Sequence, residues 1–178
     1  MNGRRWFFIL FLTGLGWAAE GRTQDVPAPL RAWQYIVIHH SATATGTAGT
    51  FEAHHRARGM ANGLAYHFVV DNGSMGTQDG HIETGQRWVK QIQGGHCRQP
   101  DINEKGIGIC LVGDFTDRQP TQRQLDSVAL LIRGLQDQFN ITDDNVVGHG
   151  EVLGESSECP GVNFPWDELR QRLKALPR

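Results

Sequence analysis

The stretch Tyr35-Ile36-Val37-Ile38-His39-His40 is the clearest indication of how this chain folds. Residues 35–38 are continuously apolar and mostly β-branched, a pattern typical of a strand that is buried on both faces of a sheet. The run stops at two histidines, and small and polar residues begin a loop directly after them. The sequence therefore predicts a buried strand that carries an imidazole to the end of a sheet.

Other apolar runs follow with helical segments between them, which indicates an α/β domain. Strands are expected over residues 64–70, 106–113 and 146–147, and helices over 50–59, 121–139 and from 163 onward. The run at 106–113 is expected to be central, and its glycines indicate that a neighbour packs closely against its backbone. Thr50 is the expected cap of the first helix, and Thr121-Gln122-Arg123-Gln124 matches a capping box at the start of the next. The prediction is one domain over 33–178, a central mixed β-sheet flanked by helices, after an irregular lead-in over 19–32.

The N-terminal residues have the pattern of a signal peptide. Arg4 and Arg5 precede a run of thirteen apolar or small residues, Trp6 to Ala18, which is short for a membrane span. We expect residues 1–18 to be removed after Ala18 and the protein to be exported, to the periplasm or the extracellular space, with no membrane segment left. An uncleaved membrane anchor is the alternative.

Charge and cysteine content narrow the possible partners. The formal net charge is −2, so composition gives no reason to expect nucleic acid or an anionic membrane as a partner, and we expect a monomer. Three cysteines are an odd number for an exported protein. Cys97 and Cys110 could form a disulfide, which would leave Cys159 for another use such as a metal.

A second histidine and that third cysteine complete a candidate metal site. His149 follows the short strand at 146–147, and Cys159 stands ten residues later in a loop before Pro160. Strands that end in histidine can bring both imidazoles to one edge of an open α/β sheet. His39, His149 and Cys159 would suit zinc and leave a fourth tetrahedral position for water. On spacing alone, an ordinary surface or packing role for these residues is equally open, and His67 is expected to be structural.

Five motifs stand in the order in which they occur in one known family. They are Ile36-Val37-Ile38-His39-His40-Ser41-Ala42, Tyr66-His67-Phe68, Gly106-Ile107-Gly108-Ile109-Cys110-Leu111-Val112-Gly113-Asp114-Phe115, Gly148-His149-Gly150-Glu151-Val152 and Cys159-Pro160-Gly161. With them the chain resembles the type 2 N-acetylmuramoyl-L-alanine amidases, which include phage lysozyme-type amidases and peptidoglycan recognition proteins. The resemblance runs from about residue 33 to residue 166.

The resemblance implies a zinc site and a catalytic group beside it. His39, His149 and Cys159 would be the zinc ligands, and Tyr66 would donate a hydrogen bond to the oxyanion formed when an amide is attacked. Ser157 is the second candidate catalytic residue and stands where the family commonly carries lysine or threonine; a serine there can donate a hydrogen bond but cannot bring a positive charge. Glu155 and Glu158 flank it and could act as bases, although nothing in the sequence directs them at the metal.

The resemblance also implies a groove for a peptidoglycan or muropeptide substrate. The residues expected to line it are His40, Arg87, Trp88, His96 and Asn103, with Arg87 placed to meet a carboxylate of the stem peptide. The implied reaction is zinc-dependent hydrolysis of the amide between N-acetylmuramic acid and L-alanine.

Two other functions stay open at this point. One is a protein that binds peptidoglycan without cutting it; such relatives typically lack the ligand cysteine, often with serine in its place. The other is a cysteine hydrolase with Cys159 as nucleophile and His149 as base, which would leave His39 and Tyr66 without a role.

Overall fold

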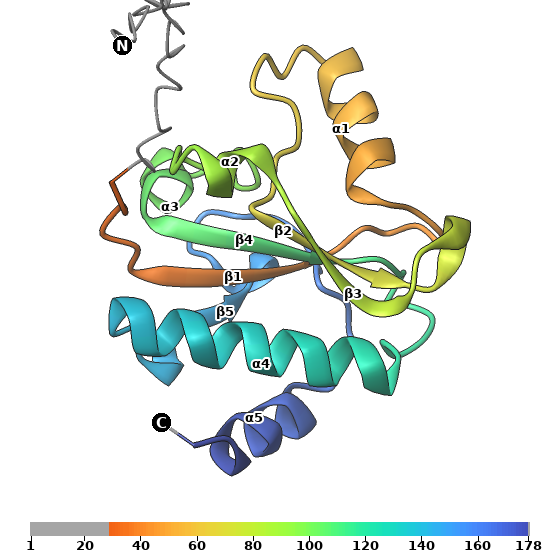
Figure 1. Cartoon of the computed structure of the whole chain (residues 1–178), viewed down its shortest axis with the longest axis vertical. Helices are drawn as coiled ribbons and strands as arrows, with labels where there is room; N and C mark the ends of the chain where they lie inside the picture. Colours follow the sequence, from red (N-terminus) through yellow and green to blue (C-terminus); the bar gives the residue numbers. More distant parts are fainter. Residues whose placement is uncertain (1–28, 178) are drawn as a thin grey trace, which may run out of the picture.

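The computed structural model describes residues 29–177, which form a five-stranded sheet with helices on both faces (Figure 1). The strands are β1 (Tyr35–His40), β2 (Phe68–Asn72), β3 (Asp79–Thr84), β4 (Gly106–Leu111) and β5 (Val146–Gly148). The helices are α1 (Ala48–Ala57), α2 (Gln86–Val89), α3 (Pro100–Lys105), α4 (Gln122–Phe139) and α5 (Trp166–Ala175). Short 3-10 turns lie at η1 (Ser74–Gly76), η2 (Asp143–Asn145) and η3 (His149–Glu151). The predicted signal peptide and most of the lead-in lie outside the described residues.

The sheet is mixed, as the sequence predicted. Its strand order is β3-β2-β4-β1-β5, so β4 is the central strand. Strand β1 runs parallel to β4 and β5, β2 runs parallel to β4, and only the edge strand β3 is antiparallel to its neighbour β2. The ends of β1 and β5 therefore meet at the same edge of the sheet.

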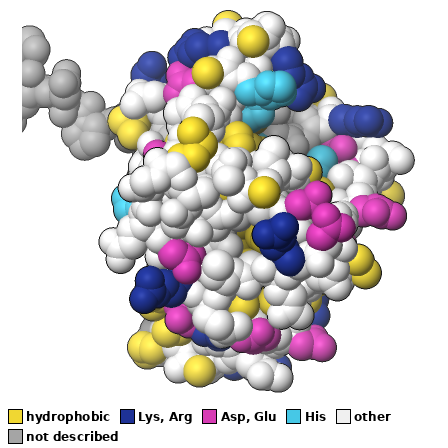
Figure 2. Space-filling view, turned by 90° about the vertical axis from the view of Figure 1, so that its right-hand side faces the viewer, with side chains coloured by type: hydrophobic (Ala, Val, Ile, Leu, Met, Phe, Trp, Pro, Cys, Tyr) yellow, Lys and Arg dark blue, Asp and Glu magenta, His cyan; other side chains and the backbone are white. Residues whose placement is uncertain are grey.

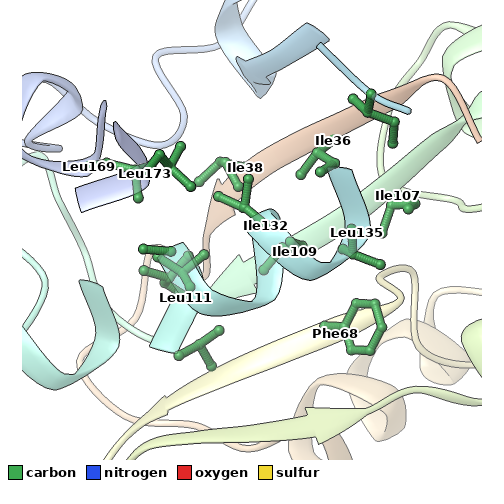
Figure 3. Packing of buried hydrophobic residues seen from close by; sticks show 14 of the residues in the cluster. Ile36, Ile38, Phe68, Ile107, Ile109, Leu111, Ile132, Leu135, Leu169 and Leu173 are labelled. Carbon is green, nitrogen blue, oxygen red and sulfur yellow. The ribbon is translucent and has the colours of Figure 1, made fainter. Parts of the chain in front are cut away.

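The main core fills the space between the sheet and helix α4, with α5 packed beyond (Figures 1 and 3). Alternate side chains of the two middle strands supply it, among them Ile36, Ile38, Ile107 and Ile109. Successive side chains of a strand point to opposite faces, so His39 and Cys110 lie on the other face. There Cys110 belongs to a smaller apolar cluster with Leu64, Val69 and Val112, against which Phe51 and Tyr66 pack.

The predicted helices and strands are present, with the main shifts near α1 and β2, whereas the short helices α2 and α3 were not predicted. Helix α1 is capped by Thr47, and Thr50 is the third helical residue, so the cap predicted at Thr50 was wrong by three positions. The two threonines form a reciprocal capping box, with the Thr47 amide donating to the Thr50 hydroxyl at 2.9 Å. Strand β2 begins at Phe68 rather than at residue 64. The capping box predicted for α4 is present at Thr121 and Gln124.

All three cysteines are free thiols in the described part of the chain, so a disulfide between Cys97 and Cys110 is not formed. Cys110 is fully buried in its apolar cluster, whereas Cys97 lies beside His96, 3.2 Å from its Nδ1 atom. Burial raises the pKa of both thiols, to about 12 for Cys97. Each thiol therefore stays protonated at neutral pH.

The surface carries charges of both signs. On the face seen in Figure 2, basic and acidic side chains of the described residues are interspersed. Within residues 29–177, no helix has the length and apolar character needed to cross a membrane. These observations agree with the small net charge and add no new partner.

Candidate metal centre

The parallel register of β1 and β5 brings two histidines together at one edge of the sheet. Ile38 of β1 pairs with Gly148 of β5, and the residues that follow them are His39 and His149. The ring centroids of His39 and His149 lie 4.6 Å apart. The structure thus brings together the two imidazoles that the sequence placed at strand ends.

The loop after His149 folds back to add Cys159. The Gly150 amide donates to the Cys159 carbonyl at 2.7 Å, which closes the loop over the strand end. A side chain at Gly150 would meet the Ser157 carbonyl oxygen at 2.2 Å, so this close approach needs glycine. The Cys159 Sγ atom then lies 3.7 Å from His39 Nδ1 and accepts the His40 amide at 3.4 Å.

These three side chains fit a zinc ion. One ligand atom from each of His39, His149 and Cys159 lies within 4.8 Å of the others. Zn–S and Zn–N bonds of about 2.3 and 2.0 Å at a tetrahedral angle separate the two donors by about 3.5 Å, close to the His39–Cys159 distance. His39 is 2% exposed, while His149 and Cys159 are partly exposed, which leaves one side of the set open to solvent.

Burial keeps His39 in the neutral form that a metal ligand requires. Desolvation, followed by the neighbouring His96 and His149, holds the pKa of His39 well below its usual range. A neutral imidazole has one protonated nitrogen and one free lone pair, so the hydrogen bond at one nitrogen decides which is free.

His96 supplies that hydrogen bond instead of lining an open groove. It is buried, with Nε2 3.3 Å from the Gly106 carbonyl oxygen and Nδ1 3.1 Å from His39 Nε2. A carbonyl only accepts, so this network assigns the proton of His96 to Nε2 and leaves Nδ1 to accept from His39. His39 then carries its proton on Nε2, and its Nδ1 lone pair faces Cys159.

Glycines make room for the buried His96 ring. A Cβ at Gly108 would lie 2.3 Å from the ring, and one at Gly94 would lie 2.4 Å from it. The close packing that the glycines of the central strand predicted is therefore confirmed at Gly108. On the same strand, the Gly108 amide donates to His67 Nδ1 at 2.9 Å, and His67 Nε2 lies 3.1 Å from the Ile92 carbonyl oxygen. His67 thus ties β4 to the segment after α2, the structural role expected for it.

Tyr66 lies next to the candidate metal ligands. Its ring centroid is 5.1 Å from that of His39, and its side chain packs against the cluster that contains Cys110, the residue paired with His39 across the sheet. Burial, with smaller effects from Cys110 and Cys159, raises the pKa of Tyr66 well above its usual value. The phenol is therefore a hydrogen-bond donor at any physiological pH.

The side chains of Arg87 and Trp88 pack inward instead of lining a groove as the resemblance implied. Arg87 is buried, and its guanidinium donates to the carbonyls of Leu64, at 2.6 Å, and Gln93. Trp88 packs between Phe68 and Phe139 at the core. Their side chains hold the segment around α2 in place, which corrects the expectation that they face substrate.

Asn103 also serves the local fold. Its Oδ1 atom accepts the amides of His96 and Cys97, and its Nδ2 atom donates to the Cys97 carbonyl. All its hydrogen-bonding atoms thus hold the loop that carries His96, in place of the expected contact with substrate.

Ser157 and the backbone of His40 lie beside the candidate ligand Cys159. The His40 side chain is 9% exposed, its Nδ1 atom accepts the Phe115 amide at 3.1 Å, and its ring lies 5.9 Å from that of the core residue Phe115. Ser157 is exposed, and its hydroxyl accepts the Cys159 amide at 3.1 Å. Ser157 therefore shapes the loop that carries Cys159.

Glu155 was a possible base in the sequence, but nothing there predicted where its side chain would lie. Its side chain is 1% exposed, and its Oε2 atom lies 3.2 Å from His149 Nε2. The chain offered one signal for it, a carboxylate between the two ligands His149 and Cys159. No local pattern showed that it would point inward.

Comparison with known proteins identifies the family. The profile of the N-acetylmuramoyl-L-alanine amidase family matches residues 29–162, which include all five motifs and the whole candidate metal centre. The chain belongs to this family.

Its relatives include recognition proteins as well as amidases. Peptidoglycan recognition protein 1 of Mus musculus is 33% identical over 152 residues, which cover 78% of this chain and 78% of that protein. The Rattus norvegicus protein of the same name is 31% identical over 114 residues, which cover 61% of this chain and 56% of that protein. The match to Holotrichia diomphalia peptidoglycan-recognition protein 2 covers 58% of that protein, so the chain spans less than two thirds of these last two relatives.

Solved structures show the same two classes. The amidase LysC from Clostridium intestinale superposes with a TM-score of 0.68 at 31% identity, covering 83% of this chain and 91% of that one. Peptidoglycan recognition protein-LE, solved in complex with tracheal cytotoxin, gives a TM-score of 0.63 at 26% identity, covering 83% and 85%. The single-domain α/β fold with a mixed sheet is therefore that of amidases and peptidoglycan recognition proteins alike.

Replacing Gly108 with alanine is expected to destabilise the protein by about 1–3 kcal/mol, because the new Cβ would overlap the His96 ring. Urea unfolding of the wild type and Gly108→Ala measures the difference. Gly134→Ala on α4 is the control: a Cβ there meets nothing within 4 Å, and the change should stabilise the helix by about 0.5–1 kcal/mol. A Gly108→Ala protein as stable as wild type would contradict this packing.

His67 should make stability depend on pH. Burial lowers its pKa to about 4, below the value of about 6.5 in an unfolded chain, so the unfolded state binds the proton more tightly. The contribution of His67 is complete above about pH 6.5, is lost as the pH falls towards 4, and amounts to about 3 kcal/mol. The free energy of unfolding, measured with urea between pH 4 and 7 with a chelator present, should depend less steeply on pH in His67→Gln than in wild type. An equal pH dependence of the free energy of unfolding in the two proteins would show that His67 does not titrate in this way.

Proposed function

We propose that this protein is an exported zinc amidase that cleaves the bond between N-acetylmuramic acid and L-alanine in peptidoglycan. The observation that carries the proposal is the convergence of His39, His149 and Cys159, with a protonated phenol beside them. Membership of the N-acetylmuramoyl-L-alanine amidase family and the similarity of the fold to that of a solved amidase support the same reaction class.

His39, through Nδ1, would hold a zinc ion together with His149 and Cys159. Bound there, zinc would lower the pKa of water and polarise the amide carbonyl. The hydrogen bonds from Gly106 through His96 keep the His39 proton on Nε2, so the ligand nitrogen stays free. The His40 amide donates to the Cys159 sulfur, which favours the thiolate form that binds zinc.

Tyr66 would stabilise the charge that develops on the amide oxygen. Its raised pKa keeps the hydroxyl protonated, so the group can donate a hydrogen bond to an oxyanion. Packing against the cluster that contains Cys110 holds the Tyr66 ring beside His39 before substrate arrives. We propose His40 and Ser157 as the residues that border the substrate, because both lie near Cys159 and neither is fully buried.

A recognition protein that binds peptidoglycan without cutting it is the second candidate. The relatives named peptidoglycan recognition proteins favour it. The presence of Cys159 favours cutting, since non-cutting relatives typically lack this cysteine. A cysteine hydrolase is the least favoured reading, because burial raises the pKa of Cys159 to about 12 and a protonated thiol is a poor nucleophile.

The proposed reaction predicts release of stem peptides when the purified protein is mixed with peptidoglycan fragments. A chelator should abolish release and added zinc should restore it, while Cys159→Ser should lose both zinc and release. Mass spectrometry of the soluble products and metal analysis measure the two outcomes. Fragment binding without release by zinc-loaded protein would favour the recognition function. Release that resists chelators but is blocked by alkylation would favour the thiol mechanism.

Tyr66→Phe should lower kcat by about 100- to 1,000-fold, the usual loss when one donor to an oxyanion is removed. Zinc content should stay at the wild-type level, because the phenol is outside the proposed ligand set. The control is Tyr35→Phe, at the far end of the strand that carries His39, which should leave kcat unchanged. A Tyr66→Phe protein with full activity would exclude the donor role.

A further inference from the structure

The Glu155 side chain contacts His149 and the backbone of a distant segment at residues 98–99. Its Oε2 atom lies 3.2 Å from His149 Nε2, and its Oε1 atom accepts the backbone amides of Arg98 and, at 3.2 Å, Gln99. The carboxylate thus contacts both a proposed zinc ligand and the segment just before helix α3. Glu155 and Gln99 are 56 residues apart in the sequence.

A carboxylate this deeply buried requires partners that stabilise its charge. The two backbone amides supply donors to one oxygen, and the imidazole is the group nearest the other. His149 Nε2 is buried and has no hydrogen-bond partner among the described residues. The Glu155 carboxylate, 3.2 Å away, lies within ion-pair distance of this nitrogen.

The loop around Glu155 has a backbone suited to this inward turn. Gly154 has φ +88°, and a Cβ there would lie 2.2 Å from the Gln99 side-chain amide nitrogen. The chain therefore approaches Gln99 closely and then turns Glu155 inward, while Leu153 on the other side of the turn is 93% exposed. Cys97, beside the same carboxylate, has its pKa raised first by burial and then by the Glu155 charge.

We propose that Glu155 is a positioning residue that orients His149 for zinc binding and holds the cysteine loop against the segment that carries His96. A carboxylate accepts only, so it keeps the His149 proton on Nε2 and leaves the other ring nitrogen free for the metal. The proposal rests on the zinc site proposed above. With it, each zinc histidine has its own acceptor: His96 for His39 and Glu155 for His149.

Direct ligation is the competing role for Glu155. Ligand atoms of Cys97, His149 and Glu155 also lie within 4.8 Å of one another, so these groups could hold a metal themselves. They share His149 with the set formed by His39 and Cys159. A second ion would therefore raise the zinc content of the wild type to two per chain and would need Glu155.

Zinc affinity of the intact protein tests the proposal, measured by competition with a chromogenic chelator. Glu155→Ala should weaken zinc binding by about 10- to 100-fold, as is usual when the acceptor behind a ligand histidine is lost. Glu155→Gln keeps an acceptor oxygen and the length of the side chain, so its loss should be smaller but at least about threefold. Should the alanine variant fail to fold, the glutamine variant decides. Glu158→Ala, an exposed carboxylate in the same loop, is the control and should bind zinc like wild type.

A second readout separates orientation from loop stability. Long-range 15N–1H spectra of the zinc-loaded protein, with the His149 signals assigned from His149→Gln, should show the proton on Nε2 in wild type and a changed pattern in Glu155→Ala. Wild-type affinity in both Glu155 variants, or an equal loss in Glu158→Ala, would overturn the proposal. So would two zinc ions per wild-type chain falling to one in Glu155→Ala. A wild-type protein that binds no zinc would instead remove the proposed function itself.

Discussion

The parallel pairing of β1 with β5 is the interaction on which the candidate metal centre depends. Because Ile38 pairs with Gly148, the next residues, His39 and His149, leave adjacent strands side by side. A shift of the pairing by one residue would separate the two imidazoles and turn buried side chains to the wrong face. Gly148 also lets the C-terminal segment close on the strand, since a Cβ there would lie 2.9 Å from Pro160, the residue after Cys159. One register thus brings the three candidate ligands together.

Around this edge the protein buries imidazoles that it must keep neutral and hydrogen-bonded. His39, His96 and His67 lie on the face of the sheet away from α4, and each uses a ring nitrogen on a backbone carbonyl, a backbone amide or another histidine. Such groups are costly when unpaired, so a continuous network fixes both their orientation and their tautomers. Gly94 and Gly108 provide the space for it. The result is a rigid base beneath the partly exposed His149 and Cys159.

The same arrangement changes which residues are available to a substrate. Arg87, Trp88 and Asn103 support the chain beneath the site, each through contacts with backbone or core. The more exposed groups left beside the candidate ligands are Tyr66 and the loop of Ser157. An amidase and a recognition protein can share the fold, so the fold alone does not decide between the two functions.

The sequence by itself determined the fold class, the central strand, the capped helix α4 and the two strands that end at His39 and His149. Those features follow from short-range periodicity and capping, which a local pattern records. Only the tertiary structure decided that Cys97 and Cys110 stay reduced, that His96 turns inward to His39, that Arg87 is buried and that Glu155 meets His149. His39 and His96 are 57 residues apart, and His39 and Cys159 are 120 apart, so each contact depends on where distant segments pack. The sequence shows which residues could bind a metal or another side chain. The packing of distant segments decides which of these contacts form.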